Sequence, residues 1–311
     1  MTQLIIKPNP LAPGATIGIV TPSEPINPED FDRALSYLKE QGFNLRVGPH
    51  ARERRGHLAG SDEDRAADLM TMFRDNSVDA IFCAAGGANS GRMLPLLDYD
   101  VIKAHPKILL GMSDPTALLS GIHARTGLIT FHGPVVQYNM KQAMTPFTER
   151  YFHDALFTSK PVGAICELGA GNILRPGKAQ GRLLGGNLTT LQQLLGTPYE
   201  PDWDGAIMFW EDVCEQPHAL DAKLTHFRNA GVFGRIAGMI VGILESCEEQ
   251  DYANMPPLTD IVLELTNDTS FPILVEVPFG HTDDKITMPI GGRAEIDTTG
   301  AVLSILESGV E

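Results

Sequence analysis

KILLGMSDPTALLSGIHA, residues 107–124, runs from an apolar stretch through a short polar joint into a second, mostly apolar stretch. The first stretch is typical of a buried parallel strand, because nearly every side chain in it is apolar. The second stretch follows Pro115 and has the length and composition of a helix. Ser113 lies in the joint between them. A serine there fits two interpretations, a cap for the helix or a nucleophile lifted above a sheet.

The chain before this stretch alternates strands with helices. Apolar β-branched runs predict strands, and capped amphipathic runs predict helices. Asn27 before Pro28, and Ser61 with an acid three residues later, are signals for helix N-termini. The predicted strands cover 16–23, 44–49, 78–87 and 107–113, and the predicted helices cover 27–42 and 61–76. This alternation requires right-handed crossovers and predicts an α/β fold with a doubly wound parallel sheet.

The regular alternation of strand and helix patterns is interrupted between residues 140 and 180. A connector with one helical stretch is followed by glycines and turn residues, and strands resume beyond it. We therefore expect an N-terminal α/β domain over 1–142 that carries Ser113, a linker over 143–177, and a C-terminal domain over 178–311.

Composition narrows the possible functions. The formal net charge of −15 and the lack of a basic stripe argue against a nucleic-acid partner. The apolar runs are too short to cross a bilayer and the N-terminus lacks a signal-peptide pattern, so we expect a cytoplasmic protein without a membrane partner. The sequence holds no H-E-x-x-H, C-x-x-C, P-loop or dinucleotide fingerprint, so we expect neither a metal nor a cofactor.

Ligands of open parallel sheets bind beyond the carboxyl ends of the strands. Loops at such ends cover 86–92, 111–116, 210–216 and 279–292. In the second of them, Ser113 fits a nucleophile elbow, although Pro115 stands where G-x-S-x-G has its second glycine. The amide of Asp114 would lie at the N-terminus of the following helix, a favourable place to stabilise an oxyanion.

The other loops carry the remaining candidates. Gly86 and Gly87 lie in a glycine-rich turn that fits an oxyanion hole, a phosphate cradle or a bare tight turn. His281 follows a predicted strand and could serve as a base for the serine. Glu211, at the end of a buried strand, and Glu215, four residues later, could each orient that histidine.

Six blocks of the sequence, in order, carry a resemblance to a known family: IGIVTPS (17–23), residues 58–100, residues 107–134, GRLLGGNLTTLQQLLGTP (181–198), residues 209–233, and FGHTDDKITMPIGG (279–292). The chain resembles the serine LD-carboxypeptidases, a family that includes muramoyltetrapeptide carboxypeptidases and microcin C immunity peptidases. The blocks run almost from one end of the chain to the other.

The resemblance implies a catalytic triad in the order Ser-Glu-His. Ser113 would be the nucleophile, Glu211 rather than Glu215 the acid, and His281 the base. The amides of Gly87 and Asp114 would form the oxyanion hole. The resemblance also implies a flavodoxin-like doubly wound N-terminal domain with a smaller mixed α/β C-terminal domain, a homodimer, and amide hydrolysis through an acyl-enzyme without a cofactor.

Two branches of the family fit. The carboxypeptidase branch releases the terminal D-alanine of the murein tetrapeptide, whereas the immunity branch cleaves peptidyl or aminoacyl adenylate analogues. The loop AAGGANS (84–90) lacks the arginine and tyrosine typical of the first branch, while the block at 209–233 follows its style. We expect Gly86, Asn89 and Ser90 to contact the substrate, and Trp203 or Trp210 could stack on a nucleobase.

We take the carboxypeptidase as the main hypothesis and the immunity peptidase as the alternative. Both predict a small peptide or a peptidyl-nucleotide as the partner. A non-catalytic small-molecule-binding module on the same fold is a further alternative, because a fold alone does not determine a function.

Overall fold

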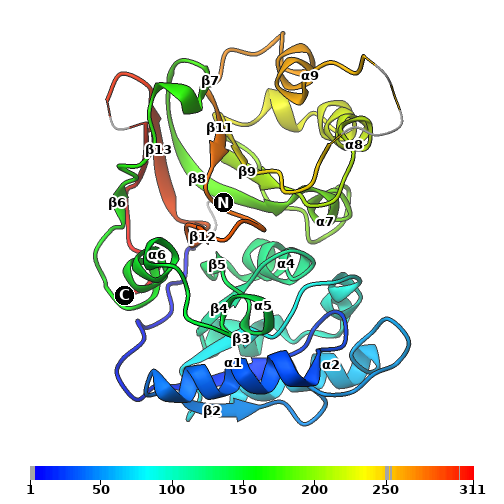
Figure 1. Cartoon of the computed structure of the whole chain (residues 1–311), viewed down its shortest axis with the longest axis vertical. Helices are drawn as coiled ribbons and strands as arrows, with labels where there is room; N and C mark the ends of the chain where they lie inside the picture. The colour runs from blue at the N-terminus through cyan, green and yellow to red at the C-terminus, as the bar shows by residue number, and fades with distance from the viewer. Residues whose placement is uncertain (1–3, 249–251, 253, 301) are drawn as a thin grey trace.

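The chain folds into two β-sheets, one in the lower and one in the upper part of Figure 1, with helices packed around and between them. The computed structural model describes residues 4–248, 252, 254–300 and 302–311. In these residues no helix is both long and apolar enough to pass through a bilayer.

The first sheet has the strand order β12-β5-β4-β3-β1-β2. Five of its strands are parallel, and their order is that of flavodoxin-like folds. The sixth strand, β12, pairs antiparallel with β5 at the edge. The predicted doubly wound sheet is therefore confirmed, and its strands are β1 (Thr16–Val20), β2 (Asn44–Val47), β3 (Ala80–Cys83), β4 (Ile108–Gly111), β5 (Thr130–His132) and β12 (Met288–Ile290).

Helices cover both faces of this sheet. Successive side chains of a strand point to opposite faces, and here apolar side chains lie on both, so both faces have to be covered. Ile17 and Ile19 pack on the side of α1, whereas Ile81 and Cys83 pack on the side of α2 and α4. The predicted caps are present, since the Asn27 side chain accepts from two backbone N–H groups and the Ser61 hydroxyl accepts from one. The helices are α1 (Pro28–Glu40), α2 (Asp62–Arg74), η1 (Ser90–Leu96), α3 (Tyr99–Ala104), α4 (Thr116–Thr126), α5 (Val136–Asn139) and α6 (Pro146–Leu156).

The second sheet is mixed, with the order β6-β14-β13-β8-β9-β10-β11-β7. Strands β8 to β11 are parallel, and the outer strands run antiparallel to their neighbours. Its strands are β6 (Gly163–Ala164), β7 (Ile173–Arg175), β8 (Lys178–Asn187), β9 (Ile207–Glu211), β10 (Gly238–Gly242), β11 (Ile273–Val277), β13 (Arg293–Asp297) and β14 (Leu303–Ile305). The helices of this half are η2 (Ala170–Asn172), α7 (Leu188–Gln192), α8 (Pro217–Asn229), η3 (Val232–Gly234) and α9 (Leu258–Leu265).

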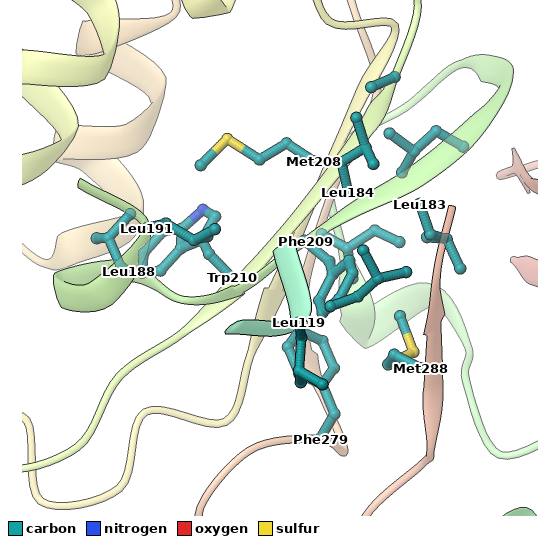
Figure 2. Packing of buried hydrophobic residues seen from close by; sticks show 14 of the residues in the cluster. Leu119, Leu183, Leu184, Leu188, Leu191, Met208, Phe209, Trp210, Phe279 and Met288 are labelled. Atoms are coloured by element: carbon teal, nitrogen blue, oxygen red, sulfur yellow. The ribbon is translucent and has the colours of Figure 1, made fainter. Parts of the chain in front are cut away.

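One apolar core joins the two sheets. Leu119 of α4 belongs to the same buried cluster as Phe209 of β9, Phe279 and Met288, and Figure 2 shows these side chains together. The chain also crosses back, because β12 follows the second sheet in sequence and completes the first. Residues 288–290 thus belong to the first sheet although they lie in the C-terminal range 178–311. The two sheets are held against each other by packing as well as by strand pairing.

Candidate active site

Ser113 occupies a strained joint between β4 and α4. Its φ is +67°, in the left-handed region that non-glycine residues rarely adopt. Pro115 is the N-cap of α4 and no side chain caps the helix there. The Ser113 hydroxyl makes no hydrogen bond to a described residue, so the structure gives no support for a capping role. Left-handed backbone of this kind costs about 1–3 kcal/mol and clusters at functional positions.

The glycine loop after β3 lies directly against this joint. A Cβ added at Gly86 would stand 2.9 Å from the Ser113 Cβ, and one added at Gly87, where φ is +122°, would stand 2.5 Å from the Glu24 Cβ. Glycine is therefore required at both places. Among the described residues, nothing accepts a hydrogen bond from the N–H of Gly87 or of Asp114. Two unused amides beside a serine hydroxyl form a suitable binding place for an oxyanion.

The side chain of Asp114 holds three loops in place. It is 3% exposed, and its carboxylate accepts from the Ser23 hydroxyl at 2.5 Å and from the Ser90 N–H at 2.8 Å. The Ser90 hydroxyl in turn donates to the Asp114 carbonyl at 2.7 Å. The loops after β1, β3 and β4 are thereby fixed relative to one another.

These bonds place the loop residues that were expected to contact the substrate. Ser90 is fully buried and both of its polar groups are used on Asp114, so it does not face the cleft. Asn89 has a left-handed backbone, and its amide nitrogen lies 3.1 Å from Nε2 of His57. Of the three, only Gly86 lines the cleft beside Ser113.

Glu211 and His281 meet at the carboxyl end of the second sheet. Glu211 is the last residue of β9 and is fully buried, and its Oε2 lies 2.7 Å from Nδ1 of His281. Gly280 permits this approach, because its φ is +99° and an added Cβ would stand 2.6 Å from the Glu211 carboxylate. The other candidate acid, Glu215, pairs instead with Lys223 on α8 at 2.9 Å.

A second imidazole lies on the far side of the same carboxylate. His132, the last residue of β5, is fully buried, and its Nε2 stands 3.7 Å from Glu211 Oε1, longer than a hydrogen bond. Burial alone would raise the pKa of Glu211, but His132 and His281 outweigh it and hold that pKa at about 2. His132 is not among the residues predicted for the site, and its only signal in the sequence is a histidine at a strand end in TFHGP (130–134).

Ser113, the glycine loop and His281 all line one cleft of about 390 Å³. Its walls include Gly86, Gly87, Ser113, Tyr138, His281 and Lys285. A second hollow of about 450 Å³ lies between β10 and α9, and the described residues that line it include no serine, cysteine or histidine.

The two tryptophans do not line the cleft, although Trp203 or Trp210 was expected to be able to stack on a nucleobase. Trp203 and Trp210 are both fully buried in the core of the second sheet, so neither can stack on a ligand. The aromatic ring in the cleft is Tyr138, which is 46% exposed and donates its hydroxyl to Glu24 at 2.7 Å.

Comparison with known proteins identifies the group to which this arrangement belongs. Residues 17–133 match the LD-carboxypeptidase N-terminal domain and residues 180–296 match the LD-carboxypeptidase C-terminal domain. A probable murein peptide carboxypeptidase of Bacillus subtilis is 36% identical over 99% of this chain and 96% of its own length.

Two further relatives have solved structures. The microcin C7 self-immunity protein MccF of Escherichia coli is 30% identical over 96% of this chain and 95% of its own. The MccF complex with glutamyl sulfamoyl guanosine superposes with a TM-score of 0.89 over 98% of this chain and 99% of that one, at 27% identity. The muramoyltetrapeptide carboxypeptidase of Oxalobacter formigenes gives a TM-score of 0.84 at 27% identity over 94% and 99%. The chain thus belongs to the LD-carboxypeptidase family and is a hydrolase of that family.

Proposed function

We propose that this protein is a serine-type LD-carboxypeptidase in which Ser113, His281 and Glu211 form the catalytic triad. The observation that carries the proposal is the 2.7 Å hydrogen bond between His281 and the buried Glu211, at the edge of a cleft that Ser113 also lines. A nucleophile, a base and an acid that orients the base are the three parts that serine hydrolysis requires.

In the first step the Ser113 oxygen attacks the carbonyl carbon of the scissile amide. His281 accepts the hydroxyl proton at Nε2, because its Nδ1–H is donated to Glu211. The buried carboxylate then stabilises the imidazolium that forms, and it remains ionised because its own pKa is held at about 2. His281 passes the proton to the leaving amine as the carbon–nitrogen bond breaks.

The negative charge that develops on the carbonyl oxygen is placed at the amides of Gly87 and Asp114. Both N–H groups are unused in the part of the chain described, so they need not break a bond to serve this role. Preorganised donors of this kind are worth about 3 kcal/mol each to the transition state. Water, activated by His281, then attacks the acyl-enzyme and releases Ser113.

We propose the L,D-linked murein tetrapeptide as the substrate and its terminal D-alanine as the product. The carboxypeptidase names of the Bacillus and Oxalobacter relatives support this choice. A cleft of about 390 Å³ falls within the range of small-molecule sites and suits the end of a peptide.

A second candidate is the cleavage of aminoacyl or peptidyl adenylate analogues. The MccF complex with glutamyl sulfamoyl guanosine supports it, and so does the glycine loop without arginine or tyrosine. Tyr138 is the cleft side chain on which a nucleobase could stack, since both tryptophans are buried.

Mass spectrometry separates these activities. We would incubate the wild type with UDP-MurNAc-tetrapeptide and, separately, with an aminoacyl sulfamoyl adenosine, each beside Ser113→Ala. Release of D-alanine by the wild type alone supports the carboxypeptidase, whereas cleavage of the adenylate analogue alone supports the immunity peptidase. Equal inertness of both proteins on both substrates, together with ligand binding, would favour the non-catalytic binding module.

The assembly and cellular location of the chain also belong to the proposal. We propose a homodimer that acts in the cytoplasm on a small-molecule substrate. Light scattering on the purified chain measures the oligomeric state, and a monomer at micromolar concentration would contradict the dimer.

A further inference from the structure

The cleft contains a buried cation that the triad does not use. Lys285 follows His281 by four residues, is 1% exposed and lines the cleft with Ser113. Its ammonium makes no hydrogen bond and no ion pair within 4 Å to a described residue. Buried charges in proteins are normally paired, because an unpaired charge loses its hydration without compensation.

Carboxylates near this ammonium affect its pKa, although none of them forms an ion pair with it. Burial lowers the pKa of Lys285 to about 8, while the carboxylates of Asp283, Glu211 and Asp284 act in the opposite direction. These carboxylates attract the ammonium from a distance, since none is close enough to form an ion pair. The ammonium, with a pKa of about 8, is therefore mainly positively charged at neutral pH, and it lines the cleft without an ion-pair partner among the described residues.

The backbone around Lys285 is fixed. Its N–H donates to the hydroxyl of Thr148 on α6 at 2.9 Å, and the same hydroxyl donates to the carbonyl of Asp283 at 2.8 Å. The loop is thus tied to α6 at Lys285 itself and at Asp283, two residues earlier. A binding group held in place in this way loses little entropy when a ligand arrives.

The remainder of the cleft does not supply a better partner for an anion. Apart from His281 and Lys285, the charged side chains among the described residues that line the cleft are the carboxylates of Glu24, Glu245 and Asp283. Arg92, at the end of the glycine-rich loop, pairs with Asp62 instead. A peptide carboxylate entering this cleft would meet negative charge on several sides, so it needs a cation nearby.

We propose that the ammonium of Lys285 binds the anionic group on the leaving side of the scissile amide, which in a carboxypeptidase substrate is the terminal carboxylate. This inference rests on the proposed function and extends it, because it explains how the enzyme distinguishes a chain end from an internal amide. A sulfamate or phosphoramidate in an adenylate analogue would offer the same site a different anion.

The test compares two tetrapeptides that differ only in the terminal group, D-alanine or D-alanine amide. Wild type should cleave the acid faster than the amide, and Lys285→Met should lower kcat/KM on the acid by roughly 10- to 100-fold, the range for a hydrogen bond between charged groups. On the amide, the same variant should lower kcat/KM by much less than it does on the acid. Lys285→Arg, which keeps the charge, should retain part of the preference for the acid.

Matched controls separate a binding role from a structural one. Lys223→Met removes a lysine that pairs with Glu215 outside the cleft, and it should leave both substrates unaffected. The rate at which a fluorophosphonate labels Ser113 should be the same in Lys285→Met and wild type, because the triad remains assembled. An equal loss on acid and amide substrates, or a loss of labelling, would overturn the inference.

Two other outcomes would separate a failure of the proposed function from a different anion at Lys285. If the wild type cleaves neither tetrapeptide, the proposed function fails first, and the inference falls with it. If Lys285→Met keeps its preference for the acid but loses cleavage of aminoacyl sulfamoyl adenosine, the anion at this site is the sulfamate, and the assignment of a carboxylate is wrong.

Discussion

Replacing Glu211 by glutamine keeps the shape of the side chain and removes the charge that accepts the His281 hydrogen bond. The pKa of this carboxyl is about 2 in the folded protein, against an ordinary value of 4.5. One pH unit between these values corresponds to about 1.4 kcal/mol. Because the folded pKa is the lower one, ionisation of Glu211 stabilises the fold above pH 4.5, by about 3 kcal/mol, and this contribution disappears as the pH falls through 2.

A glutamine side chain does not titrate in this pH range. The unfolding free energies of wild type and Glu211→Gln should therefore depend differently on pH. Between pH 6 and pH 3 wild type should lose about 2 kcal/mol of unfolding free energy that Glu211→Gln does not lose. Urea denaturation at both pH values measures this, with the fluorescence of the buried Trp203 and Trp210 as the probe. Activity of the variant should fall on the order of 10⁴-fold, because an amide can fix the wrong histidine tautomer.

The control is Glu245→Gln, the same substitution at an exposed carboxylate of the same cleft. Its unfolding free energy should follow that of wild type at both pH values. Parallel curves for wild type and Glu211→Gln would refute the reasoning, because they would show that the folded protein does not hold this carboxylate ionised.

Further predictions concern the groups that support the site. Asp114→Ala should lower the unfolding free energy by about 2–5 kcal/mol, because the Ser23 hydroxyl and the Ser90 N–H lose their acceptor, and Asp114→Asn should cost less; equal losses in urea denaturation would contradict this. His132→Phe should lower kcat on the order of 10-fold with little change in KM, because the ring acts only through Glu211. Steady-state kinetics measures both constants, and an unchanged kcat would exclude a role for His132.

Much of the site could be predicted because its signals are local. Strand periodicity and helix caps fix where strands end, and chemistry in a parallel sheet gathers at those ends. Ser113, Glu211 and His281 are predicted in this way, and the resemblance implies the roles that we propose for them. The structure adds that Glu211, and not Glu215, faces the histidine.

What could not be predicted depends on contacts between distant segments. His132 reaches Glu211 across the boundary between two sheets, and no spacing in the sequence encodes that approach. Ser90 turns inward because the Asp114 carboxylate lies beneath it, and the tryptophans fill the interior rather than the cleft. Pairing of Met288–Ile290 with β5 was equally hidden, because a three-residue strand containing proline has almost no local signature and fits only an edge.

Because β12 pairs with β5, the first sheet is complete only when the C-terminal part of the chain is present. A fragment that ends between residues 143 and 177 would leave the edge of β5 unpaired, an open template for aggregation. A chimera joined between residues 143 and 177 would place a strand from one parent against a sheet from the other, with Met288 opposite His132. We therefore expect substitutions at these two positions to depend on each other, and the two halves of the chain to be inherited as a single unit rather than exchanged as modules.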